Sequence, residues 1–281
     1  TRKESSAASD VYKRQTRNQW RNRILALGLW LAAAGAAQAQ TESSVVITGT
    51  DGCLFAAWAS LADTDVQAID ASTRLIAEAK TRLASRGIHL ELLLLPDKVG
   101  FYEDRLPQGK TVSASVKKRY ATILDSLQKA GVDVLDAKSV FTGLRAAGKD
   151  VYYRSDQHWT LAAAETTADA IATRIKQAVP KMAGAPGSGM PLGKETRERR
   201  YGDLADLFLP PEQRAAVGRE TFTVRYAAES LPLLDAGKAP VHVTGHSMVQ
   251  AYYGFPQKLS NGIDRPCLLY TSDAADDSLR V

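Results

Sequence analysis

The stretch "IHLELLLLP", residues 88–96, is the part of the sequence that most limits the fold. It is an almost unbroken apolar run that ends at a proline. A strand with one face in water alternates apolar and polar residues, whereas a continuous apolar run is typical of a strand covered on both faces. Such strands occur mainly in parallel sheets with helices packed on each side. The stretch therefore predicts a central strand of an α/β domain.

The segments around this stretch alternate between strand-like and helix-like patterns. The expected strands cover residues 44–48, 132–137 and 240–245, and the expected helices cover residues 66–86, 113–130 and 160–178. Thr160 can cap the third of these helices, because its hydroxyl can accept a hydrogen bond from a backbone N–H of the first turn. A further helix is expected from about Met248 to Leu259. This order predicts a three-layer α/β domain with a mainly parallel sheet.

A flexible excursion is expected at residues 183–191, followed by the charged stretch "KETRERR" at residues 194–200. A solvated charged loop is the simpler interpretation of this stretch. The alternative is that Arg197, Arg199 and Arg200 meet an acidic polymer chain.

Residues 1–15 and 267–281 are expected to be translated DNA from a sequencing adapter. When residues 5–15 are back-translated, the reverse complement of that DNA reads, in a shifted frame, as residues 267–276. Unrelated tails do not mirror each other in this way, and the repeated DNA resembles a transposon-type adapter. Both tails are therefore excluded from the fold, as a fusion scar would be, and neither is expected to contribute to the core. The native part is then residues 16–266, with its C-terminal end truncated.

Residues 16–39 have the composition of a signal peptide. Three arginines precede an apolar segment, residues 24–34, which is too short for a comfortable membrane span. Ala37 and Ala39 supply the small residues of a cleavage site, so the mature chain would start at Gln40. Export to a bacterial periplasm is the expected consequence, and an uncleaved membrane anchor is the alternative.

The mature segment, residues 40–266, is long enough to form one domain with a sizeable core. The whole chain carries 36 Lys and Arg against 31 Asp and Glu, a net charge of +5. About +2 remains for the mature segment once the tails and the leader are excluded. No basic stripe suggests nucleic acid as a partner. Because Cys267 lies in the second tail, Cys53 is alone and no disulfide framework is expected.

A candidate nucleophile follows the last predicted strand. The stretch "VTGHSM", residues 243–248, places Ser247 at a turn between a strand and a helix, where a hydroxyl is lifted above the sheet edge. Serine needs a general base, because its hydroxyl is barely acidic at neutral pH. His158 can take the proton if a carboxylate orients it, and Asp156 lies two residues earlier on the same side of an extended segment. These three residues are therefore candidates for one catalytic group.

Each of these signals has a simpler explanation. Ser247 and Asp156 can act as helix or turn caps, and His158 can be a half-buried histidine bonded to the backbone. A further alternative is a metal site formed by His242 and His246 together with the same aspartate and histidine. Spacing of four residues brings side chains together on a helix, however, whereas this segment is expected to be a strand and a turn. No metal is therefore predicted.

Five motifs occur in an informative order. They are "GTDGCLF" (49–55), "PDKVGFYEDRLP" (96–107), "VYYRSDQHWT" (151–160), "GDLADLF" (202–208) and "VTGHSM" (243–248). In this order they resemble the alginate O-acetyltransferases of the AlgX/AlgJ type, over nearly all of residues 44–260. The resemblance implies an SGNH-hydrolase-like domain with a catalytic triad of Ser247, His158 and Asp156. The serine comes last in the chain, whereas it comes first in ordinary SGNH hydrolases.

The resemblance further implies an enzyme that transfers acetyl groups to hydroxyls of an alginate-like exopolysaccharide in the periplasm, through an acetyl-serine intermediate. A carbohydrate acetylesterase with the same triad and a non-catalytic polysaccharide-binding scaffold are the alternatives. The expected partners are the exopolysaccharide acceptor and a membrane-bound acyltransferase that supplies the acetyl group. No cofactor is expected.

Two residues depart from the family pattern. Cys53 stands where the family usually has tryptophan, which is expected to change local packing. His246 replaces the threonine that commonly precedes the serine, and it puts an additional acid–base group beside Ser247. If the triad forms, His158 is expected to contact Ser247, and His246 is expected to point away. The triad is also expected to face a cleft open to solvent, because a polymer must enter.

Overall fold

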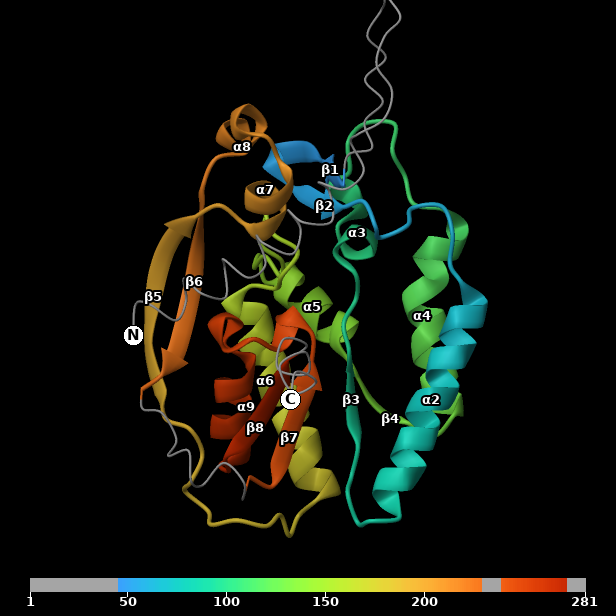
Figure 1. Cartoon of the computed structure of the whole chain (residues 1–281), viewed down its shortest axis with the longest axis vertical. Coiled ribbons are helices and arrows are strands. Elements are labelled where there is room, and N and C mark those ends of the chain that lie inside the picture. The colour runs from blue at the N-terminus through green and yellow to red at the C-terminus, as the bar shows by residue number, and fades with distance from the viewer. Residues whose placement is uncertain (1–44, 229–238, 272–281) are drawn as a thin grey trace, which may run out of the picture. The chain divides into compact units, whose positions relative to one another are not determined.

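The computed structural model describes residues 45–228 and 239–271 (Figure 1). Both ranges lie in one compact unit, Ser44–Val281. The expected signal peptide, residues 16–39, and the first expected adapter tail, residues 1–15, lie outside the described residues. Within the described ranges, no helix combines the length and the apolarity that crossing a bilayer requires.

Helices and strands alternate along the described chain. The strands are β1 (Val46–Thr48), β2 (Leu54–Ala56), β3 (Glu91–Leu94), β4 (Asp133–Asp136), β5 (Leu192–Arg200), β6 (Glu220–Ala227), β7 (Val241–Gly245) and β8 (Cys267–Thr271). The helices are α2 (Val66–Ala84), α3 (Lys98–Phe101), α4 (Ala114–Lys129), α5 (Ala137–Ala146), α6 (Leu161–Ala178), α7 (Asp203–Phe208), α8 (Pro211–Val217) and α9 (Phe255–Ile263). Short 3₁₀ helices are η1 (Thr50–Gly52), η2 (Glu103–Arg105), η4 (Ser247–Val249) and η5 (Ala251–Tyr253). The predicted α/β class is confirmed, and three predicted helices correspond to α2, α4 and α6.

The described strands pair two by two. β3 pairs with β4 and β7 with β8, both in parallel, whereas β1–β2 and β5–β6 are antiparallel. The predicted mainly parallel sheet is not confirmed, because no backbone ladder joins one described pair to another. The antiparallel pair β5–β6 contributes to the difference, since β5 carries charged residues rather than the apolar runs on which the prediction relied.

β3 lies within the apolar stretch that predicted the fold. Leu93 and Leu95 pack against the main core, whereas Leu92 and Leu94 pack against a second cluster formed with residues of α2 and α4. Successive strand residues point to opposite faces, so both faces of this strand are covered, as predicted. Figure 1 shows α2 and α4 running beside β3 and β4.

The expected cap of α6 is present, because the Thr160 hydroxyl accepts a hydrogen bond from the Ala163 N–H over 3.3 Å. Small residues on the buried face of α6 allow α9 to approach closely. A Cβ added to Gly262 of α9 would lie 3.0 Å from the Ala172 Cβ of α6. This tight packing fixes α9 and, through it, the segment that precedes α9.

The helix expected from about Met248 starts later than predicted. η4 and η5 follow β7, and α9 begins only at Phe255. Pro256 lies in the first turn of α9, where its missing N–H removes no helical hydrogen bond. Gly254 has φ of 89°, in the left-handed region, and a Cβ there would lie 2.4 Å from Leu161 Cδ1. The glycine turn and the proline together set the helix start, which the apolar spacing alone misplaced.

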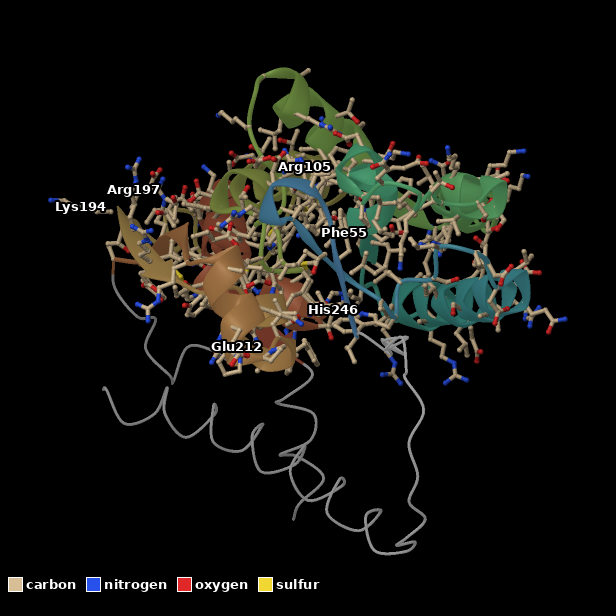
Figure 2. The ribbon with its side chains drawn as sticks, turned by 90° about the horizontal axis from the view of Figure 1, so that it is seen from above. Phe55, Arg105, Lys194, Arg197, Glu212 and His246 are labelled. Atoms are coloured by element: carbon tan, nitrogen blue, oxygen red, sulfur yellow. The ribbon has the colours of Figure 1, made fainter. Side chains whose placement is uncertain are left out.

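The charged stretch at residues 194–200 is a strand and not the predicted loop. It belongs to β5, which pairs with β6 over most of its length. Figure 2 shows Lys194 and Arg197 pointing outward from this ribbon. Arg200, at the end of β5, instead lies with its guanidinium 3.8 Å from the centroid of the Phe222 ring. The sequence did not show the apolar–polar alternation that is typical of a strand, because both faces of β5 carry charges.

Part of the second tail, which was expected to be adapter-derived, contributes to the fold, contrary to expectation. Cys267–Thr271 form β8, and Cys267 and Leu269 pack against the main core. Tyr270 is 43% exposed. The physical reason is that a short apolar run after α9 can pair with the free edge of β7, whichever DNA encoded it. The adapter origin of the segment stays a proposal, which sequencing the locus from a library made without transposase would test.

Candidate active site

Ser247 lies where β7 ends and the chain turns. The strand stops at Gly245, His246 is extended, and Ser247 is the first residue of η4. A Cβ on Gly245 would lie 3.0 Å from the Val249 side chain, so this turn is tightly packed. The turn leaves Ser247 partly exposed at the end of the strand, which is the placement that the sequence predicted.

Asp156 and His158 lie in a turn that is anchored at both ends. An isolated β-bridge joins Tyr152 to Trp159, and both of these aromatic residues are buried. Inside the bridge, the Tyr153 N–H donates to the His158 carbonyl over 3.1 Å. The anchoring places the polar side chains in the interior, with His158 2% exposed and Asp156 fully buried.

The side chains of Asp156, His158 and Ser247 form a continuous hydrogen-bonded chain. His158 Nδ1 lies 2.6 Å from Asp156 Oδ1, and His158 Nε2 lies 2.7 Å from Ser247 Oγ, across 89 positions of sequence. Because a carboxylate only accepts, the proton is assigned to Nδ1, and Nε2 is left to accept from the serine hydroxyl. General-base activation of a serine requires this order of contacts. The expected contacts are therefore present.

The environment of Asp156 favours its ionised form. The backbone N–H of His158 donates to Oδ1 over 2.9 Å, and that of Asp203 donates to Oδ2 over 3.0 Å. Burial acts to raise the pKa of Asp156, but the hydrogen bonds and charge of His158 and the Asp203 amide outweigh it, so the pKa lies below its ordinary value. The carboxylate is thus charged at neutral pH and can stabilise an imidazolium.

Three further residues lie around Asp156 and His158. Asp203 Oδ2 lies 3.5 Å from His158 Nδ1, and burial followed by the charge of Asp156 raises the pKa of Asp203. The Tyr253 ring stacks on the imidazole with centroids 4.3 Å apart, and its Oη lies 2.8 Å from Nδ1. Arg200 Nη1 lies 3.3 Å from Asp203 Oδ1. Asp203 lies in the quoted "GDLADLF" motif, and Arg200 lies in the charged stretch that was considered as a contact for an acidic polymer. Nothing in the sequence singled out Tyr253.

His246 does not take the place of His158. Its Nδ1 accepts a hydrogen bond from the Met248 N–H over 3.4 Å, which caps η4. Its ring, labelled in Figure 2, is exposed. Burial of part of the ring and the nearby His158 lower the pKa of His246, so this residue is neutral at pH 7. The hydroxyl of Ser247 is bonded to His158 instead, as expected.

Among the described residues, one group has metal-binding geometry, formed by Asp156, His158 and Asp203. The imidazole could bind an ion through Nδ1 only by giving up its hydrogen bond to Asp156. Arg200 lies 3.7 Å from Asp156 and 3.3 Å from the second carboxylate, so its charge would repel a divalent cation. His242 is bonded elsewhere, to Tyr270 over 3.2 Å. This donor set does not fit a metal, and the three histidines of the metal alternative do not bind a common point.

The structure has a cavity of about 730 Å³ that none of the three residues lines. Its walls come from residues between 149 and 154, from α6, and from β5 and β6. Asp156, His158 and Ser247 do not line it, so it is not the solvent-open cleft that the sequence analysis expected over the triad. The hydrogen-bonded chain defines the candidate site, because it holds the groups that can do chemistry.

Comparison with known proteins agrees with this geometry. The sequence model of the family described as "SGNH hydrolase-like domain, acetyltransferase AlgX" matches residues 46–280. The chain is 29% identical over 147 residues to the "Probable alginate O-acetylase AlgJ" of Pseudomonas fluorescens. That alignment covers 51% of this chain and 36% of the relative, so the chain matches about a third of the relative's length.

Two solved structures share the fold. The O-acetyltransferase domain of Pseudomonas putida AlgJ superposes with a TM-score of 0.67 at 21% identity, covering 80% of this chain and 78% of that one. Pseudomonas aeruginosa AlgX superposes with a TM-score of 0.58 at 18% identity, covering 80% of this chain and 54% of that one.

Proposed function

Because this chain belongs to the family of SGNH hydrolase-like acetyltransferase domains of the AlgX type, we propose that it is a polysaccharide O-acetyltransferase. Ser247 is the nucleophile, His158 the general base and Asp156 the carboxylate that orients the imidazole. The observation that carries the proposal is the hydrogen-bonded chain joining these three side chains, with contacts of 2.6 and 2.7 Å.

The first half-reaction loads the serine. Ser247 Oγ attacks the carbonyl carbon of the acetyl donor while its proton passes to His158 Nε2. The buried carboxylate of Asp156 stabilises the imidazolium that forms. As the tetrahedral intermediate collapses, the bond to the donor breaks and His158 returns the proton to the leaving group. The product is acetyl-Ser247 with the histidine neutral again.

The second half-reaction unloads the serine onto a sugar. A hydroxyl of the acceptor gives its proton to His158 Nε2 and attacks the acetyl carbon. Collapse of the second intermediate breaks the bond to Ser247 Oγ, which takes the proton back from the imidazolium. Water in place of the sugar would give acetate, so the same three residues serve an acetylesterase equally well. The acceptor therefore decides between transfer and hydrolysis.

The test compares the fate of the acetyl group with and without an acceptor. With a chromogenic acetyl ester as donor, adding uronate oligosaccharides is expected to move most of the acetyl from water to sugar, measured as acetylated oligosaccharide by mass spectrometry. Oligosaccharides with methylated hydroxyls are the matched control and should receive none. Release of acetate alone at every acceptor concentration would identify an esterase. Polymer binding without turnover of any acetyl ester would identify a scaffold.

The proposed partners follow from the chemistry of the two half-reactions. The acceptor is an alginate-like exopolysaccharide, in keeping with the name of the curated relative. The donor side needs an activated acetyl group outside the cytoplasm, and a membrane-bound acyltransferase is the proposed supplier.

The proposed compartment is the periplasm, on the basis of the signal-like composition of residues 16–39. Protein recovered from a periplasmic extract is expected to begin at Gln40, which N-terminal mass spectrometry measures. An intact leader in the membrane fraction would contradict cleavage and favour the anchored alternative.

A further inference from the structure

Lys98 is a buried cation beneath the turn that carries Asp156. It is the first residue of α3 and is 8% exposed. Its ammonium lies 5.5 Å from the centroid of the Phe55 ring, which Figure 2 labels. The cap of α3 is held in place, because Asp97 accepts from the Gly100 N–H over 2.6 Å. Lysine is almost never buried in this way unless its charge is partnered.

The ammonium is surrounded by backbone carbonyls. It donates to the carbonyls of Leu54 (2.7 Å), Tyr153 (2.8 Å), Asp156 (2.8 Å) and Arg154 (2.9 Å). Three of these acceptors belong to the turn of residues 153–156, and the fourth belongs to β2. Since an ammonium has three N–H groups, every donor is used and the four carbonyls share them.

Glu220, on β6, binds the amide groups of the same turn. Its carboxylate accepts from the Arg154 N–H over 2.9 Å and from the Ser155 N–H over 2.7 Å, and also from the Ser155 hydroxyl. A cation thus binds the carbonyl groups of the turn, and an anion binds its amide groups. The backbone of residues 153–156 is thereby fixed by charge-assisted hydrogen bonds to both its carbonyl and its amide groups.

We propose that Lys98 and Glu220 are positioning residues of the active site, which hold the turn of residues 153–156 so that the Asp156 carboxylate meets His158. This inference rests on the proposed function. Both residues act through Asp156 and neither touches the reacting atoms. Asp156 is bound to Lys98 through its carbonyl and to His158 through its side chain, so a shift of the turn moves the carboxylate directly. Misplacement by about 1 Å of a group that must be aligned can lower a rate by about 100-fold.

The charges around the ammonium make the arrangement sensitive to pH. Burial lowers the pKa of Lys98 to about 8, and Arg105 acts in the same direction. Cys53, Asp156 and Glu220 face the ammonium from the other packed segments and act to raise its pKa. Above about pH 8 the neutral amine has two N–H groups for four carbonyls, so the turn is held less firmly.

The experiment measures steady-state acetyl transfer by Lys98→Met and Glu220→Gln in the full chain. Each variant is expected to lose about 100-fold in kcat, with KM for the oligosaccharide acceptor changed less than about threefold. The rate at which a sulfonyl fluoride labels Ser247 should fall in parallel with kcat. Lys80→Met is the matched control, because Lys80 also bonds a backbone carbonyl, that of Gly131, but lies on α2. It should behave as wild type.

A pH profile separates positioning from a merely structural role. The wild-type kcat is expected to fall above about pH 8. Glu220→Gln removes a charge that raises the pKa of Lys98, so the basic limb should move to lower pH. This measurement keeps the proposal testable if Lys98→Met does not fold. A folded Glu220→Gln protein with wild-type kcat and an unmoved basic limb would overturn it. Failure of the proposed function itself is distinguishable, because the wild type would then transfer no acetyl to the oligosaccharide at any pH.

Discussion

Ser247→Ala is expected to lower kcat for acetyl transfer by about 10⁴- to 10⁶-fold, the range seen when a triad nucleophile is removed. The hydroxyl is the group that would carry the acetyl between donor and acceptor, and no other side chain is bonded to Nε2 of His158 within the described part of the chain. Steady-state kinetics with the chromogenic ester and an oligosaccharide acceptor measure the effect.

Two further variants make this prediction specific. Ser139→Ala removes an exposed serine hydroxyl on α5 and should leave kcat unchanged. The double variant Ser247→Ala/His158→Ala should be no slower than Ser247→Ala alone, because residues that act as one unit are not additive. A Ser247→Ala protein that keeps more than a tenth of wild-type kcat would mean that the acetyl does not pass through this serine.

Asp156→Asn is expected to lower kcat by about 10⁴-fold while leaving the fold intact. The carboxylate accepts from Nδ1 over 2.6 Å, and an amide in its place can donate to that nitrogen. The imidazole would then carry its proton on Nε2, which could no longer accept from the Ser247 hydroxyl. Steady-state kinetics give the rate, and ¹⁵N NMR of the histidine ring reports the change of tautomer.

Asp203→Asn is the matched comparison, because the Asp203 carboxylate also lies near Nδ1 of His158. The contact is longer, 3.5 Å, and Asp203 pairs with Arg200. We expect a loss of less than about tenfold in kcat, since the orienting hydrogen bond from Nδ1 to Asp156 stays in place. A larger loss in kcat for Asp203→Asn than for Asp156→Asn would assign the orienting role to Asp203 and contradict the assignment of Asp156.

The three candidate residues could be predicted because each has a local signal. Asp156 and His158 share one segment at a spacing of two, and Ser247 follows a glycine at the end of a strand. Their meeting across 89 positions could not be derived from spacing, and the family resemblance supplied that pairing. Asp203 and Lys98 lie in two of the quoted motifs, but nothing in the sequence indicated what these two side chains contact. A lysine after a proline and an aspartate looks like a surface residue, and Lys98 becomes a buried partner of the turn only through tertiary packing.

The fold was predictable where packing leaves a strong pattern in the sequence. The leucines of β3 form a continuous run because both faces of the strand are covered. β5 was missed because charges stand on both faces of a two-stranded ribbon, and such a strand has no apolar alternation to detect. β8 was excluded because its DNA was interpreted as an adapter, and that interpretation has no bearing on whether an apolar segment pairs with a free strand edge.

The most direct test of the account is to look for the acetyl group on Ser247. The wild-type protein would be incubated briefly with an acetyl donor without acceptor, quenched in acid, digested and analysed by mass spectrometry. We predict one acetyl group on the peptide that contains Ser247, which disappears when uronate oligosaccharides are added before the quench and which is absent from Ser247→Ala. Acetyl transfer to the oligosaccharide without any acetylation of Ser247, or with the acetyl on another residue such as His246, would contradict the account.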